Sequence, residues 1–314
     1  MRAFIFPGQG SQFVGMGKDL AESFQEARDV FQEVDDALSQ SLFKLMSEGP
    51  DDQLNLTENT QPALMAVSVA VSRILEKQGG FKLADKASFV AGHSLGEYSA
   101  LTAVGTFALA DAARLLKIRG QSMQAATPLG VGSMAAILGL DYDDVAEIAA
   151  EASRQTGEVC EAANDNSPGQ VVVSGHAGAV AVAMQLASAK GAKRAVELPV
   201  SAPFHCALMA PAAERMREAL AEVAVNAPAI PVYANVTAAP VTDPATIRDL
   251  LVQQVTGTVR WRESVLAMEA AGVKDMAELG AGKVLSGLVK RIATDVNAAS
   301  VGTPEQIEAF LQTL

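Results

Sequence analysis

The sequence contains few of the residues that most often hold metals or cross-link a fold. Among its 314 residues are two cysteines, three histidines, one tryptophan and three tyrosines. Two cysteines, Cys160 and Cys206, cannot form a disulfide framework, so we expect reduced thiols. The histidines stand far apart at positions 93, 176 and 205, without His-x-x-x-His or Cys-x-x-Cys spacing, and we therefore predict no metal site.

Basic charge and long apolar runs are also scarce. The chain has 24 Lys and Arg against 36 Asp and Glu, a formal net charge of −12 with no basic run, which excludes ordinary nucleic-acid binding. No stretch approaches about 18 consecutive apolar residues, and the apolar run before Pro7 is too short for a signal peptide. The composition, 49% hydrophobic and 19% charged, is typical of a globular protein. We expect a cytoplasmic protein without membrane contact.

The apolar pattern that is present predicts alternating strands and helices. Strands are expected at Arg2–Phe6 and Ala87–Gly92, and helices at 18–46, Pro62–Lys77 and Leu109–Ala126. The same alternation resumes after position 200. Such a chain is typical of an α/β fold with a mostly parallel sheet covered by helices on both faces.

Between about residues 128 and 200 the predicted order changes to βαββαβ, the order of a ferredoxin-like domain. Its four strands are expected at Ser133–Leu138, Glu158–Ala163, Gln170–Ser174 and Lys193–Leu198. The sequence therefore predicts an α/β domain built from residues 1–127 and 201–314, with a ferredoxin-like insertion at 128–200.

Residues 92–96 read Gly-His-Ser-Leu-Gly directly after a predicted strand. In a sharp strand-to-helix turn, small residues at −2 and +2 let the backbone fold back and expose the central serine above the sheet. Ser94 is thus a candidate nucleophile, with an ordinary loop as the alternative. A serine hydroxyl needs a base. His205 is the candidate, because the side chain of His93 should diverge from its neighbour and His176 is expected in a solvent-exposed turn.

Arg119 falls on the apolar stripe of the helix predicted at 109–126. A guanidinium on a buried face needs a partner, because an unpaired buried charge is costly. It either forms an internal ion pair with an acidic side chain or is held ready for a substrate carboxylate, which arginine binds with two parallel hydrogen bonds. A dinucleotide site is excluded, since Phe13 replaces the third glycine of the motif that begins at Gly8.

Several short motifs, taken together, resemble one family along the whole chain. They are Phe6-Pro7-Gly8-Gln9-Gly10-Ser11-Gln12, Thr60-Gln61-Pro62-Ala63, Gly92-His93-Ser94-Leu95-Gly96-Glu97-Tyr98, Arg119-Gly120, Asn166-Ser167-Pro168-Gly169-Gln170, Phe204-His205 and Gly282-Lys283-Val284-Leu285. The chain resembles the malonyl-CoA:acyl carrier protein transacylases, the standalone acyltransferases of type II fatty-acid synthesis. The resemblance implies a hydrolase-like α/β domain with a ferredoxin-like insertion.

The resemblance also implies a catalytic mechanism. Ser94 would attack malonyl-CoA and carry the malonyl group as an ester until the phosphopantetheine thiol of acyl carrier protein takes it. His205 would act as general base and then general acid, oriented by the main-chain carbonyl of Gln254 with no aspartate in a triad. The backbone N–H groups of Gln9 and Leu95 would form an oxyanion hole.

Three further residues receive substrate-binding roles from the resemblance. Arg119 would bind the malonyl carboxylate, and Asn166 would line the cleft from the insertion. Phe204 would occupy the space that an α-methyl group on the substrate needs, which favours malonyl over methylmalonyl.

The expected partners are malonyl-CoA and acyl carrier protein, with no cofactor of the enzyme's own and a monomeric chain. Docking of an acidic carrier to a chain of charge −12 needs local basic residues. We hypothesise that some members of a basic set form the docking patch: Lys190, Lys193, Arg194, Lys283, Lys290 and Arg291.

Three other functions remain possible from the sequence. A generic esterase of α/β-hydrolase type would require a histidine late in the chain, and none follows position 205. A thioesterase or proofreading hydrolase on the same fold is a closer alternative, because water and thiol compete for one ester. A non-catalytic scaffold is disfavoured by the joint presence of Ser94, His205 and Arg119.

Overall fold

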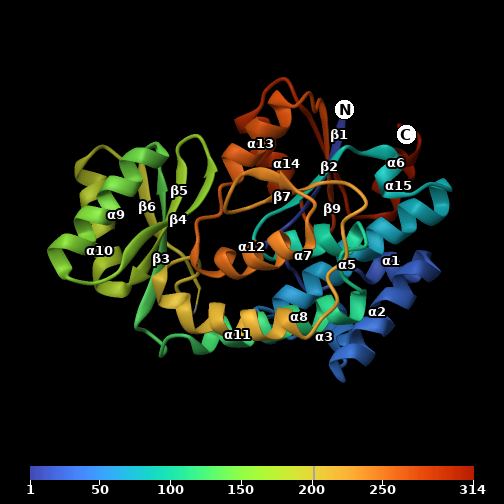
Figure 1. Ribbon diagram of the computed structural model, residues 1–314, viewed down its shortest axis with the longest axis horizontal. Helices are drawn as coiled ribbons and strands as arrows, with labels where there is room; N and C mark the ends of the chain where they lie inside the picture. Colours follow the sequence, from blue (N-terminus) through green and yellow to red (C-terminus); the bar gives the residue numbers. More distant parts are fainter. Residues whose placement is uncertain (201) are drawn as a thin grey trace.

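The computed structural model describes residues 1–200 and 202–314, which form two separate β-sheets with helices packed around them (Figure 1). The predicted boundary at residue 201 falls on the one position that lies outside the described residues.

The larger sheet has six strands in the order β10-β9-β1-β2-β7-β8. All neighbouring pairs are parallel except β7 and β8, which pair antiparallel at one edge. The strands are β1 (Arg2–Phe6), β2 (Phe89–Gly92), β7 (Val232–Ala234), β8 (Ala239–Val241), β9 (Asp275–Leu279) and β10 (Asn297–Val301).

Helices cover both faces of this sheet, as the alternating side chains of β1 require. Phe4 and Phe6 point into a large core beneath α5 and α8, whereas Ala3 and Ile5 point into a second core beneath α13 and α14. The helices outside the second sheet are α1 (Lys18–Ser23), α2 (Gln25–Leu38), α3 (Leu42–Glu48), α4 (Asp51–Leu54), α5 (Thr57–Gly79), α6 (Leu83–Lys86), α7 (Leu95–Ala103), α8 (Leu109–Ala125), the short 3₁₀ helix η1 (Ala207–Met209), α11 (Ala210–Ala221), α12 (Pro244–Thr256), α13 (Trp261–Ala270), α14 (Val284–Ile292) and α15 (Pro304–Leu311).

The prediction of one continuous helix over residues 18–46 is wrong, because the structure has three helices there: α1, α2 and α3. Phe24 is extended, with φ −129° and ψ 132°, and separates α1 from α2. Ser39 adopts a left-handed conformation with φ 49° and ends α2 before α3 begins.

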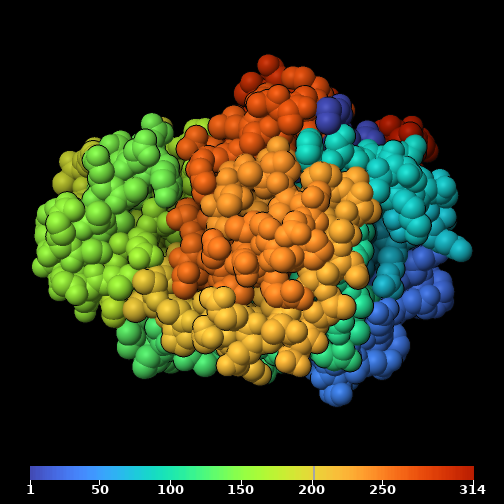
Figure 2. All heavy atoms as spheres, viewed as in Figure 1, coloured from blue at the N-terminus to red at the C-terminus, as the bar shows by residue number. Residues whose placement is uncertain are grey.

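The second sheet is antiparallel and has the order β4-β5-β3-β6. Its elements are β3 (Gly132–Leu138), α9 (Tyr142–Thr156), β4 (Cys160–Ser167), β5 (Gln170–His176), α10 (Ala177–Ala189) and β6 (Arg194–Glu197). The two helices pack on one face around a small core of their own, and this part forms a lobe at one side of the molecule (Figure 2). The predicted fold class is confirmed, and the division into domains at 127/128 and 200/201 stays a prediction.

One strand of the lobe is fastened to the rest of the protein. The amide of Asp165 donates to the carbonyl of Val259 at 3.0 Å, and the amide of Val259 donates to the carbonyl of Ala163 at 2.9 Å. The Arg262 guanidinium binds both carboxylate oxygens of Asp165, at 2.9–3.0 Å. We call these four residues the β4 clamp. It joins the lobe to the start of α13 (Trp261–Ala270) and to the residues just before it.

Within residues 1–200 and 202–314, no helix is both long and apolar enough to cross a membrane.

Candidate active site

Ser94 lies between the end of β2 and the start of α7, in a backbone conformation that serines rarely adopt (φ 53°, ψ −112°). A Cβ on Gly92 would meet the backbone of Gly96 at 1.9 Å, and one on Gly96 would meet the carbonyl oxygen of Phe6 at 2.2 Å. Both flanking residues must therefore be glycine. The strained turn is held because the Ser94 amide donates to Oδ1 of Asn235 at 2.7 Å.

His205 contacts Ser94 directly, although 111 residues separate them in the chain. Its Nε2 lies 2.8 Å from Ser94 Oγ, and its Nδ1 lies 2.8 Å from the main-chain carbonyl of Gln254. Because a carbonyl only accepts, Nδ1 carries the proton and Nε2 is left as the acceptor for the serine proton. This is the tautomer that a general base needs.

The imidazole of His205 is only 4% exposed and stays neutral in this environment. Burial, and after it the positive charge of Arg119, lowers the pKa of His205 from 6.5 to about 3. The base is thus unprotonated over the whole physiological range.

Arg119 lies beside the same serine and is 1% exposed. Its Nη1 donates to Oε1 of Gln61 at 2.8 Å, while Nη2 donates to Ser94 Oγ at 3.1 Å and to Oε1 of Gln254 at 3.0 Å. Its Nε is buried with no hydrogen-bond partner among the described residues. None of the ion pairs found in the described part of the chain includes Arg119. The internal ion pair offered above as one explanation of Arg119 is therefore wrong, because neutral side chains solvate the guanidinium instead.

These groups open into a cavity of about 510 Å³ between the two sheets. The other predicted site residues, Gln9, Leu95, Asn166 and Phe204, also line this cavity. Leu95 is the first residue of α7, where backbone N–H groups have no acceptor within the helix. Asn166 lies on β4 between Asp165 and Ser167, where the register of the strand pairing shifts. The Oδ1 atom of Asn166 lies 2.8 Å from Nε2 of His93.

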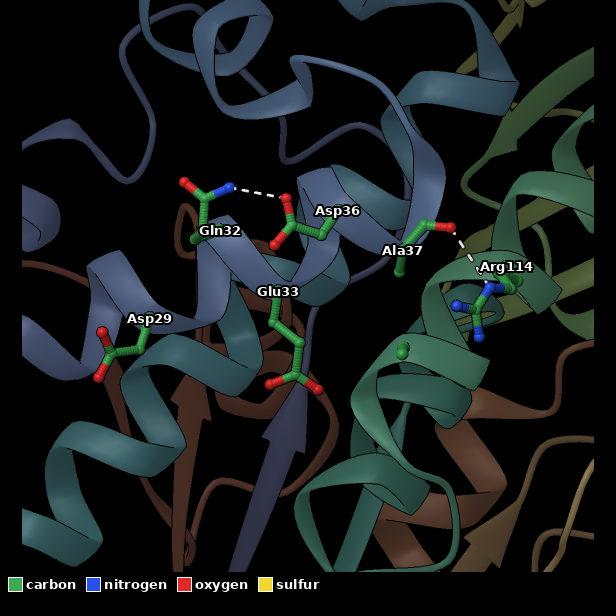
Figure 3. Close-up of a pocket in the computed structure, with 7 residues that line it drawn as sticks. Asp29, Gln32, Glu33, Asp36, Ala37 and Arg114 are labelled. Carbon is green, nitrogen blue, oxygen red and sulfur yellow. Dashed lines mark hydrogen bonds between the residues drawn. The ribbon is translucent and has the colours of Figure 1, made fainter.

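A second hollow of about 470 Å³ lies between α2 and α8 (Figure 3). Three of its lining residues carry carboxylates, Asp29, Glu33 and Asp36, and its guanidinium, Arg114, donates to the carbonyl of Ala37. The figure shows Asp36 accepting from Gln32 and Asp29 pointing away from the other groups. This hollow is lined by no serine, cysteine or histidine, whereas the cavity at Ser94 contains a serine hydrogen-bonded to a histidine, which makes it the candidate active site.

The whole chain matches known acyltransferases. Residues 3–305 match the acyl transferase domain family. The "Malonyl CoA-acyl carrier protein transacylase" of Escherichia coli K12 is 47% identical over 310 residues, which cover 99% of this chain and 98% of that protein. The chain belongs to the malonyl-CoA–acyl carrier protein transacylase family.

Solved structures of the family have the same fold. The acyl-carrier-protein S-malonyltransferase of Bartonella henselae superimposes with a TM-score of 0.97 at 58% identity and covers 99% of this chain and 98% of its own. A malonyl-transacylase solved together with its type II polyketide synthase acyl carrier protein has a TM-score of 0.95 at 42% identity, covering 100% of this chain and 99% of its own. The family resemblance predicted from the motifs is confirmed.

Several residues at the site were not identified from the sequence. Gln61 and Glu97 fall inside motifs that were quoted, but periodicity gave no sign that their side chains accept from Arg119 and from Gln254, respectively. Asn235 follows β7 without any motif, and the Gln254 side chain contacts Ser94, Glu97 and Arg119 in addition to its carbonyl's contact with His205. His176, expected in an exposed turn, is half-buried at the start of α10, where its Nδ1 accepts from the Val159 amide.

Proposed function

We propose that this protein transfers the malonyl group from malonyl-CoA to the phosphopantetheine thiol of an acyl carrier protein, through a malonyl ester on Ser94. The observation that carries the proposal is the placement of Arg119: a buried guanidinium without a carboxylate partner, 3.1 Å from the nucleophile of a Ser–His pair. A generic serine hydrolase has no use for such a group. A donor that ends in a carboxylate gives it a partner of opposite charge.

In the first half-reaction, Ser94 Oγ attacks the thioester carbonyl as its proton moves to Nε2 of His205, 2.8 Å away. The negative charge of the tetrahedral intermediate would be held by the N–H groups of Gln9 and Leu95. When the intermediate collapses, the C–S bond breaks, the proton on His205 passes to the CoA thiolate and the malonyl ester remains on Ser94. The second half-reaction reverses these steps, with the carrier thiol as nucleophile.

The malonyl group itself would lie in the cavity with its carboxylate on Arg119. Phe204, 8% exposed and lining the same cavity, would fill the space beside the α-carbon and disfavour branched donors. Asn166 would close the cavity from the lobe. We propose that residues 128–200 form a domain whose function is to supply this wall.

The carrier protein would dock near the cavity mouth through members of the basic set. All six residues are exposed, although Lys190 already pairs with Asp144 and Glu147 and Arg291 donates to Gln170. We propose a cytoplasmic, monomeric enzyme.

To test the proposal, the protein is incubated with radiolabelled malonyl-CoA, with and without a carrier protein that bears phosphopantetheine. Transfer of label to the carrier, through a stoichiometric malonyl adduct seen by mass spectrometry, is expected. Ser94→Ala should abolish the adduct, and Ser99→Ala, which changes a buried serine of the adjoining helix α7, is the matched control. Release of malonate at an equal rate without the carrier would indicate a hydrolase, and the absence of any labelling would refute catalysis.

A further inference from the structure

A buried carboxylate lies behind the Ser94 turn, in a position that the transfer steps above do not use. Glu97 is on the first turn of α7 and is 2% exposed. Its Oε2 accepts from the Asn235 amide at 3.0 Å and from Nε2 of Gln254 at 2.8 Å. A carboxylate in such a position should have a cationic neighbour or a specific function, because its burial is costly.

The Gln254 amide connects this carboxylate to Arg119. Its Oε1 accepts from Nη2 of Arg119 at 3.0 Å, while its Nε2 donates to Glu97 and lies 3.0 Å from the carbonyl oxygen of Ser94. The orientation of the amide is unambiguous, because only oxygen can face the guanidinium and only nitrogen can face the carboxylate. Glu97 and Arg119 are thus opposite charges joined through one neutral side chain.

The second partner of Glu97 holds both sides of the nucleophile's turn. Asn235 accepts from the Ser94 amide at 2.7 Å through Oδ1 and donates to the Gly92 carbonyl at 2.7 Å through Nδ2. Its own backbone amide is the group bound by Glu97. A displaced Glu97 would therefore disturb the serine turn and the guanidinium together.

We propose that Glu97 is a positioning residue of the malonyl-transfer site: through Gln254 it orients Arg119, through Asn235 it supports the Ser94 turn, and its charge state modulates the affinity of Arg119 for a substrate carboxylate. The inference rests on the function proposed above. Glu97 touches neither substrate nor reacting atoms, and it acts through these two residues and through its charge.

The charge of Glu97 should change within the physiological range. Burial raises the pKa of Glu97 to about 7, opposed by its hydrogen bonds and by Arg119. The groups of other elements that face it are Arg119 of α8, Gln254 of α12 and Asn235, and on its own helix the phenol of Tyr98 is close enough to interact. Of these only Arg119 is charged at neutral pH.

This arrangement determines the direction in which the preference for malonyl-CoA changes with pH. Below pH 7 Glu97 is protonated and leaves the positive charge of Arg119 undiminished for a malonyl carboxylate, whereas above pH 7 the negative charge of the ionised Glu97 partly offsets that of Arg119 and repels the incoming anion. The preference for malonyl-CoA over acetyl-CoA should therefore fall as pH rises. His205, with its pKa near 3, does not titrate in this interval, and the phosphates of CoA are common to both donors.

The experiment measures kcat/KM for acylation by malonyl-CoA and by acetyl-CoA from about pH 6 to pH 8. In the wild type the ratio of the two is expected to fall by about tenfold over this range. Glu97→Gln keeps an oxygen that can accept both hydrogen bonds, so its kcat should stay within about threefold of the wild type while its ratio becomes independent of pH. Glu97→Met keeps the volume but neither bond, and should lower kcat for both donors by at least about tenfold.

Glu278→Gln is the matched control. Glu278 is also a fully buried carboxylate with a raised pKa, and it accepts from the Leu285 and Ser286 amides at the start of α14, with no contact to Arg119 or Ser94 among the described residues. It should retain the pH-dependent ratio of the wild type.

Two results would overturn the inference: a Glu97→Gln variant with the pH-dependent ratio of the wild type, or a folded Glu97→Met variant with unchanged kcat. If Glu97→Met does not fold, Glu97→Gln decides alone. A wild type that forms no malonyl ester would refute the proposed function itself, whereas a malonylated wild type with an unaltered Glu97→Gln would refute only the role of Glu97.

Discussion

Replacement of Arg119 by alanine should convert a malonyl-selective site into an unselective one. In the structure the guanidinium donates to three neutral oxygens, those of Gln61, Gln254 and Ser94. A malonyl carboxylate would take two charge-assisted hydrogen bonds in place of some of these. Each is worth about 1.5–3 kcal/mol, and the exchanged neutral bonds reduce the gain, so the net loss in the variant is about 2–4 kcal/mol.

That loss corresponds to a decrease of about 30- to 1000-fold in kcat/KM for malonyl-CoA relative to acetyl-CoA. The ratio is the right measurement, because loss of the bond from Arg119 to Ser94 Oγ affects both donors alike. Arg119→Lys should restore only part of the ratio, since one ammonium cannot make the planar two-pronged contact. Arg114→Ala, on the exposed side of α8, is the matched control and should leave the ratio unchanged. An unchanged ratio in a folded Arg119→Ala variant would refute the reasoning.

The other predictions concern the base, the docking surface and the clamp. His205→Ala should slow acylation by about 10²–10⁴-fold in a folded protein, and an Asp or Glu whose change to alanine is equally damaging would point instead to a full triad. His205 binds a proton below pH 6.5 in the unfolded chain but only near pH 3 in the folded chain. The free energy of unfolding should therefore decrease as the pH falls from 6.5 to 3. Over the same pH range, the thermal midpoint of the His205→Gln variant should decrease less than that of the wild type. Charge reversal within the basic set should weaken transfer to the carrier and spare acylation by malonyl-CoA, whereas equal loss in both half-reactions would argue against docking there. Arg262→Ala leaves the buried carboxylate of Asp165 unpaired. Because Arg262 is partly exposed, the free energy of unfolding, measured by urea denaturation, should decrease by only about 1–3 kcal/mol. An unchanged free energy of unfolding would mean that the pair does not hold the lobe.

The sequence was sufficient for the elements whose patterns are local. The turn at Ser94 could be predicted because its two glycines are sterically required within five residues, and the lobe because four strands and two helices follow one another in a recognisable order. The break of the first helix at Phe24 could not be predicted, because the apolar spacing continues across it and no glycine or proline marks the extended residue.

The supporting residues of the site were hidden for a different reason. Asn235 and the Gln254 side chain act through hydrogen bonds to residues 141 and 157–160 positions away, and a single sequence contains no signal for such contacts. Arg119 was noticed only because a charge on an apolar stripe is anomalous. A neutral amide in the same kind of position, such as Gln61, gives no comparable anomaly.

The adjacency of β3 and β6 has a consequence for how this molecule is assembled from parts. The chain enters the lobe along β3 and leaves along β6, and the two strands pair directly, with Leu138 opposite Arg194 and Ala135 opposite Glu197. A segment whose two ends meet can be gained or lost by a host in one local genetic event, without rethreading any strand of the larger sheet. A gene from which the segment between the start of β3 and the end of β6 was removed would still encode all six strands of the larger sheet and the Ser94 turn. Its product would lose Asn166 and one wall of the cavity.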